Sequence, residues 1–142
     1  MRTMKTTTGT FPIPNDPDKG EITLKHLLPG EVTDIQEELA GWDMRLKEDA
    51  DGTLRKEGEF KFVRGEKRYL WVTGSLVGWK NVFDAEGNDR PCDEANIIAV
   101  CREGTVVDED GVEISFGEFV GRCRDKLTEQ VRAAKEKAAK NS

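Results

Sequence analysis

Residues 105–134 read TVVDEDGVEISFGEFVGRCRDKLTEQVRAA, and the period of their hydrophobic residues changes near the middle. In the first part, the apolar residues of 105–107 and 112–114 flank the acidic turn signal at 108–111. Short apolar runs on both sides of an Asp- and Gly-containing turn are typical of a β-hairpin. This first part therefore predicts two short antiparallel strands.

The second part of the same stretch predicts a helix. Ser115 and Glu118 have the spacing of a capping box, in which two side chains accept hydrogen bonds from N–H groups at a helix start. Beyond them, apolar residues recur every three or four positions, which is the period of an amphipathic helix. We expect this helix to cover 115–138. Its apolar positions are Phe116, Phe119, Val120, Cys123, Leu127, Val131 and Ala134.

The N-terminal part of the chain has weaker signals. Residues 1–20 contain Thr, Gly and three of the five prolines without periodicity, which predicts a flexible arm. Residues 21–26 alternate apolar and polar side chains and predict a strand. Residues 31–40 predict a helix that begins with the capping box Thr33-x-x-Gln36 and ends at Gly41.

The middle of the chain predicts further short elements. Residues 42–63 alternate around an acidic turn, which predicts a hairpin. Residues 66–82 fit a helical stripe, although their Val, Thr and Gly content also favours a strand; we favour the helix. A turn is expected at 83–88, followed by a short helix over 94–102 with Asp93 as its N-cap.

These elements predict an α+β fold with a small antiparallel sheet or hairpins and three to four helices. Residues 1–20 would be the arm, and 21–142 would be a single domain that ends in the long helix 115–138. Leu, Ile, Val and Phe together provide only 32 of the 142 residues. The core is therefore small, and a partner is expected to complete the burial of apolar surface.

Charge is divided unevenly along the chain. It contains 22 Lys and Arg against 28 Asp and Glu, but residues 122–142 hold seven basic and three acidic residues. The acidic balance argues against nucleic-acid binding, and no apolar stretch approaches the length of about 18 residues that a membrane span needs. The charge division predicts head-to-tail self-association or docking on an acidic helix. The alternative is a solvated helix end whose cations suit the helix dipole.

Motifs for chemistry are absent from the sequence. Cys92, Cys101 and Cys123 lack disulfide-framework or zinc-ligand spacing, which fits a reducing cytoplasm. His26 is the single histidine, and neither a GxSxG elbow nor a Gly-rich phosphate loop occurs. Three Asp-x-[Asp/Glu]-Gly segments lack the ligand spacing of an EF-hand and predict turns. They are residues 49–52, 84–87 and 108–111. The sequence therefore predicts no enzyme, no cofactor and no metal site.

Aromatic residues are concentrated in the middle, where six of the ten lie within residues 60–83. They could form a core or an exposed anchor patch, since Trp and Tyr dominate the energetics of protein interfaces. For the second interpretation, the candidate partner-binding residues are four of these aromatic side chains and two arginines of the basic helix. They are Tyr69, Trp71, Trp79, Phe83, Arg122 and Arg132.

Two segments resemble a known family. VGWKNVFDAEGNDRPCDEAN (77–96) is similar to the V-G-W-x-x-V-x-D-x-x-G-x-x-x-P-[CF]-x-x-x-N segment of small phage and prophage tail proteins, particularly tail assembly chaperones. EITLKHLLPGEVTDI (21–35) resembles the opening strand and helix start of the same proteins.

This resemblance implies a non-enzymatic protein of the bacterial host cytoplasm. Members of the family hold the long helical tape measure protein until tail tube subunits polymerise around it. The implied partners are the tape measure protein, the tail tube protein and further copies of the chain, with a partner helix bound in an apolar groove. A structural component of the phage tail or connector is the alternative function.

Overall fold

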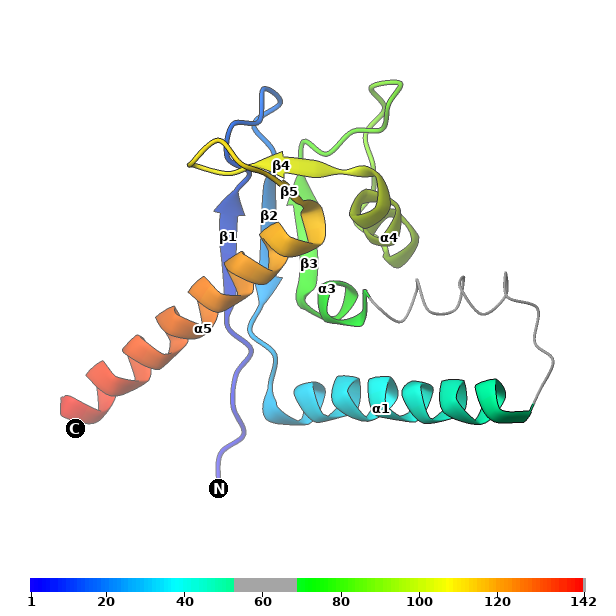
Figure 1. Cartoon of the computed structure of the whole chain (residues 1–142). Helices are drawn as coiled ribbons and strands as arrows, with labels where there is room; N and C mark the ends of the chain where they lie inside the picture. Colours follow the sequence, from blue (N-terminus) through cyan, green and yellow to red (C-terminus); the bar gives the residue numbers. More distant parts are fainter. Residues whose placement is uncertain (53–68, 142) are drawn as a thin grey trace.

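The computed structural model describes residues 1–52 and 69–141, and the side chains of 1–41 and 69–141. Within these residues the chain is α+β, with four helices, a three-stranded sheet and a two-stranded sheet (Figure 1). The strands are β1 (Thr8–Pro12), β2 (Glu21–Lys25), β3 (Leu76–Lys80), β4 (Thr105–Val107) and β5 (Glu113–Ser115). The helices are α1 (Pro29–Gly52), α3 (Leu70–Ser75), α4 (Glu94–Glu103) and α5 (Phe116–Lys140). The predicted fold class is confirmed.

The core lies between the three-stranded sheet and α5. β2 is the central strand and pairs antiparallel with both β1 and β3. Its Ile22 and Leu24 side chains are fully buried, in one hydrophobic cluster with Val120 and Leu127 of α5. Helix α5 crosses the sheet and then extends past it toward the C-terminus (Figure 1). None of the helices in the described ranges is both long enough and apolar enough to span a membrane.

Three elements that were predicted from local signals are confirmed, namely α5, α4 and the β4–β5 hairpin. The Ser115 hydroxyl accepts a hydrogen bond from the Glu118 N–H at 3.1 Å, as the capping box predicts. The Asp93 carboxylate likewise accepts from the Asn96 N–H at 2.8 Å and begins α4. β4 and β5 pair antiparallel around the turn at 108–111, where Gly111 has a φ of +80°. Each of these signals lies within a few residues of the structure that it specifies.

The expectation of a flexible arm over 1–20 is wrong for its second half. Residues Thr8–Pro12 form β1, an edge strand that buries Phe11. The loop that follows is closed by a hydrogen bond from the Ile13 N–H to the Gly20 carbonyl at 2.9 Å. β1 buries one large side chain and ends in Pro12, which an edge strand tolerates. Periodicity therefore gave no sign of it.

Helix α1 is longer than predicted. It begins at Pro29, and Glu31 accepts the Leu28 N–H at 2.9 Å, whereas the Thr33 hydroxyl donates to the Pro29 carbonyl inside the helix. The helix also continues through Gly41, since one glycine costs a helix only about 1 kcal/mol. The hairpin predicted for 42–63 is therefore wrong over 42–52, and the rest of it lies outside the described residues.

The segment 66–82 combines both alternatives that its sequence left open. Residues 70–75 form the short helix α3, and residues 76–80 form strand β3. The helix prediction is thus right for the first part and wrong for the second, while 66–68 lie outside the described residues. β3 is a strand because β2 offers it a pairing edge, a tertiary partner that overrides local preference. The predicted turn at 83–88 is confirmed, with Gly87 at a φ of +85°.

Candidate functional site

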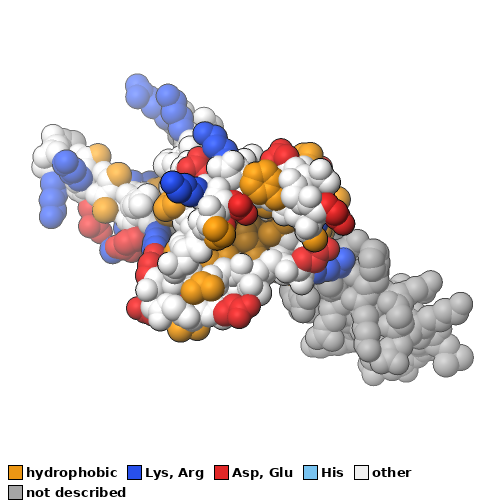
Figure 2. All heavy atoms as spheres, turned by 90° about the horizontal axis from the view of Figure 1, so that it is seen from above, with side chains coloured by type: hydrophobic (Ala, Val, Ile, Leu, Met, Phe, Trp, Pro, Cys, Tyr) orange, Lys and Arg blue, Asp and Glu red, His pale blue; other side chains and the backbone are white. Residues whose placement is uncertain are grey.

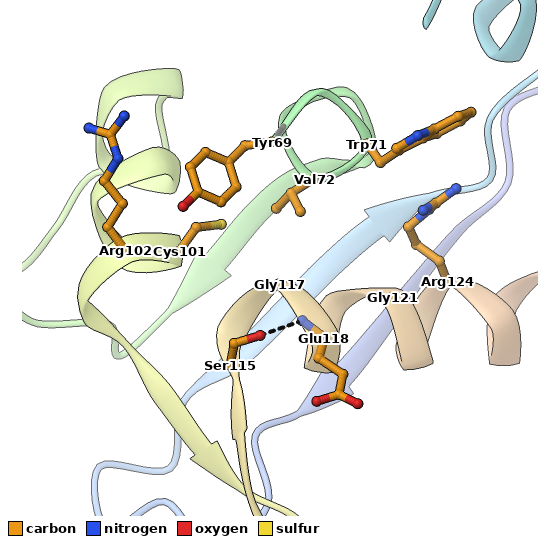
Figure 3. A pocket seen from close by; sticks show the side chains of 10 residues that line it. All are labelled: Tyr69, Trp71, Val72, Cys101, Arg102, Ser115, Gly117, Glu118, Gly121 and Arg124. Atoms are coloured by element: carbon orange, nitrogen blue, oxygen red, sulfur yellow. Dashed lines mark hydrogen bonds between the residues drawn. The ribbon is translucent and has the colours of Figure 1, made fainter. Parts of the chain in front are cut away.

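A groove separates α3 and α4 from the first turns of α5 (Figure 3). It has a volume of about 600 Å³. We call it the aromatic groove, because two aromatic side chains of the α3 region, Tyr69 and Trp71, stand along it. Its lining residues are Tyr69, Trp71, Val72, Cys101, Arg102, Ser115, Gly117, Glu118, Gly121 and Arg124.

An arginine lies over an aromatic ring at each end of the groove. The guanidinium carbon of Arg124 is 4.9 Å from the centre of the Trp71 ring, and that of Arg102 is 5.9 Å from the centre of the Tyr69 ring. Both distances suit cation–π attraction. Figure 3 shows the two pairs at opposite ends of the groove. The groove therefore holds two positive charges beside aromatic and apolar side chains, and the Glu118 carboxylate and the Ser115 hydroxyl also line it.

The Arg124 guanidinium is partly withdrawn from water. Burial lowers its pKa below the ordinary value, although the neighbouring Asp125 carboxylate acts in the opposite direction. Arginine keeps its charge at neutral pH regardless of such a shift. A poorly hydrated guanidinium gains more free energy on binding a carboxylate than a fully hydrated guanidinium does, because less water has to be displaced from it.

Two glycines of α5 leave its backbone open to the groove. Gly117 and Gly121 are four residues apart on one side of the helix, and a Cβ at either position would meet no atom within 4 Å. A glycine inside a helix costs about 1 kcal/mol relative to alanine. The packing around these two positions does not require glycine. Their small size instead allows another backbone to approach α5 closely.

The structure places the six predicted partner-binding residues in different surroundings. Tyr69 and Trp71 line the aromatic groove. Trp79 is partly buried and packs against the core: its ring lies edge-on to Phe116, with ring centres 6.4 Å apart, and its Nε1 donates to the Arg90 carbonyl at 2.7 Å. Phe83 is 40% exposed and lies in a separate hollow. The four aromatic side chains therefore do not form one patch.

The two predicted arginines have acidic partners within the chain. Arg122 donates to Asp108 at 2.9 Å and pairs with Glu118 at 3.5 Å. Arg132 pairs with Glu129 and with Glu136 on its own helix. Neither arginine lines the aromatic groove, and Arg102 and Arg124 lie there instead. The signal that could have indicated this place was the pair of glycines inside the clearest predicted helix.

Cys92 and Cys123 are not set up as nucleophiles. Burial raises the pKa of the Cys123 thiol to about 11, and burial, together with the Asp93 carboxylate, raises the pKa of the Cys92 thiol. A thiol with a raised pKa holds little of the reactive thiolate at neutral pH. Among the described side chains, those of residues 1–41 and 69–141, no three His, Cys, Asp or Glu residues are grouped so that they could hold a metal ion.

Comparisons with family models, with curated proteins and with solved structures gave no match to this chain.

Proposed function

We propose that this protein is a non-enzymatic phage tail assembly chaperone that binds the tape measure protein in the bacterial host cytoplasm. Two lines of support are independent of each other. The segments 77–96 and 21–35 resemble that family. The aromatic groove joins aromatic and apolar side chains to two arginines, a lining that suits a partner helix. In this proposal the tail tube protein later takes over the tape measure protein.

The pair Gly117 and Gly121 is the observation that carries the binding site. Small residues four apart on a helix allow a second helix to pack closely against it, as at GxxxG contacts. The ligand that fits is an amphipathic helix with small or apolar residues facing these glycines. Carboxylates spaced to reach Arg102 and Arg124 would complete its binding. Helical tape measure segments of that composition are the proposed target.

The test is co-expression and co-purification with a phage tape measure protein, followed by titration calorimetry. We expect Gly121→Leu to reduce affinity at least tenfold, because the new side chain fills the groove. The fold should be retained, because a Cβ at this position meets no atom within 4 Å and leucine favours helix. Circular dichroism would verify the fold.

Gln130→Leu is the matched control, since residue 130 is exposed on the same helix and outside the groove. It should bind like the wild-type protein. Equal affinity of folded Gly121→Leu and wild type would show that the partner binds elsewhere. Absence of any complex at low salt would contradict the chaperone proposal itself.

The alternative of a structural tail or connector component relied on an N-terminal arm that becomes ordered against a neighbour. Residues 8–12 already form β1 in the chain's own sheet, so that argument loses its main support. Mass spectrometry of purified particles distinguishes the two functions. A chaperone is absent from the finished tail, whereas a structural subunit is present.

A further inference from the structure

A second concave surface lies where three loops meet at the end of the molecule opposite the C-terminus (Figure 1). We call it the loop-end hollow; it has a volume of about 280 Å³ and is lined by residues of 13–18, 81–83 and 104–107, with Val100 and Phe116. A neighbouring depression of about 270 Å³ shares Phe83 and Val100 with it. Figure 2 looks down on this end and shows hydrophobic side chains on the floor of a depression, with acidic side chains around it.

Hydrogen bonds between the loops hold this surface in shape. The Asn15 side-chain amide donates to the carbonyls of Val107 at 3.2 Å and Asp108 at 2.8 Å. The Asn81 amide donates to the Lys19 carbonyl at 3.3 Å. Apolar surface nevertheless stays open to water, since Phe83 is 40% exposed and Val107 is 41% exposed. Because this apolar surface is already ordered, little conformational entropy is lost when it binds a ligand.

The loops around the hollow are strongly acidic. Residues 13–20, 81–90 and 103–113 contain ten acidic and two basic residues. One of the two bases, Arg90, already pairs with Glu103 at 2.8 Å. From outside the loops, Arg122 neutralises Asp108. The ligand that this surface favours is therefore apolar on one side and positively charged.

The end of α5 has that chemistry. The last fully buried residue of α5 is Leu127, and the helix continues for 13 residues to Lys140. Glu129 and Glu136 pair with Arg132. The positive charge of this tail therefore lies on Lys135, Lys137 and Lys140. Ala134 and Ala138 extend the apolar edge of the helix into the tail.

The tail cannot reach the hollow of its own chain. Phe116 at the start of α5 lines the hollow, and Lys140 is 24 residues further along the same helix. At a rise of about 1.5 Å per residue, the two places are about 36 Å apart. A contact between them has to join two molecules. Because the two surfaces differ, each molecule can be both donor and acceptor, and such a contact propagates rather than closing as a symmetric dimer.

We propose that the C-terminal tail of α5, residues 128–140, binds in the loop-end hollow of a second copy, which produces head-to-tail assembly of this chain. Its lysines meet the acidic loops, and its alanine edge covers Phe83 and Val107. This surface is separate from the aromatic groove, so the inference does not depend on the proposed function.

The experiment uses sedimentation velocity of the full chain in about 0.05 M and about 0.5 M salt. We expect the wild-type mass to rise above 15.9 kDa with concentration at low salt and to return toward it at high salt. A tail variant carries Lys135→Glu, Lys137→Glu and Lys140→Glu. A hollow variant carries Phe83→Lys and Asp18→Lys. Each variant alone should remain at the monomer mass.

Mixing the two variants is the decisive step. The intact tail of the hollow variant can bind the intact hollow of the tail variant, so the mixture should form a complex of two chains that grows no further. Val77→Lys, at another exposed apolar side chain on β3, is the matched control and should assemble like the wild type. Circular dichroism would verify that every variant is folded.

Three results would overturn the proposal. One is a wild-type protein that stays monomeric at low salt. Another is a folded variant that still assembles alone, and the third is a mixture that stays monomeric.

Discussion

At the scale of single residues, Asp108 holds together the turn between β4 and β5. One carboxylate oxygen accepts the N–H groups of Asp110 and Val112, each at 2.9 Å, and the other accepts from Arg122 at 2.9 Å. The Val112 N–H and the Arg122 guanidinium lower the pKa of this buried carboxyl below its ordinary value. The charged form of Asp108 is thus favoured in the folded state.

The pH dependence of stability follows from the lowered pKa of Asp108. A carboxyl whose pKa is lowered by folding contributes stability above its unfolded-state pKa, and the contribution is lost as the pH falls through the folded-state value. We expect Asp108→Asn to lower the melting temperature at pH 7. The difference from wild type should shrink below about pH 4. Thermal unfolding followed by circular dichroism over a pH series measures it.

Asp110→Asn is the control for this series, because the Asp110 side chain is exposed and Asp108 accepts only its backbone N–H. Its melting temperature should follow that of the wild type at each pH. A difference between Asp108→Asn and wild type that stays constant from neutral to acidic pH would contradict the assigned role of the Asp108 charge.

At the scale of elements, an ambiguous stretch of sequence, residues 76–80, forms strand β3, which pairs with β2 beside the core. Trp79 lies opposite Ile22 of β2 and packs against Phe116. We expect Trp79→Ala to reduce the free energy of unfolding by about 3–5 kcal/mol, because it leaves a cavity and an unpaired Arg90 carbonyl. Urea denaturation measures this loss. Trp71→Ala should cost only about 1 kcal/mol, because the partly buried Trp71 ring packs against Arg124 rather than against the core cluster. Equal losses would contradict the distinction between core and groove.

What the sequence could predict depended on how local each signal was. α5, α4 and the β4–β5 hairpin have their capping or turn residues in adjacent positions, and they were predicted correctly. β1 and β3 are strands because β2 lies between them, and no local pattern reports that pairing. The aromatic groove was only partly predictable for the same reason. Tyr69 and Trp71 were recognised as aromatic, but only tertiary packing brings Arg102 and Arg124 over their rings.

At the scale of the whole molecule, α5 connects both proposed binding surfaces. Its first turns line the aromatic groove through Gly117 and Gly121, and Phe116 also reaches the loop-end hollow. Its far end is the tail proposed to bind a second copy. The chain thus combines the small core predicted from its composition with two concave surfaces and a projecting helix. A row of copies joined through their tails would present a row of aromatic grooves, which suits a long helical partner.

The integrity of this arrangement depends on the N-terminal strand, which closes one edge of the sheet. Deleting residues 1–12 removes β1 and the buried Phe11, and it leaves the backbone of β2 unpaired along one side. We expect a loss of at least about 3 kcal/mol in the free energy of unfolding, the usual cost of truncating a buried Phe. Aggregation through the open strand edge should follow.

Deletion of residues 1–6 is the control and should change stability by less than about 0.5 kcal/mol, because these residues are exposed. That shorter deletion keeps the Thr7 carbonyl, which accepts the His26 N–H at 2.7 Å. Urea denaturation and light scattering measure both effects, and wild-type stability after loss of residues 1–12 would show that the sheet holds without β1.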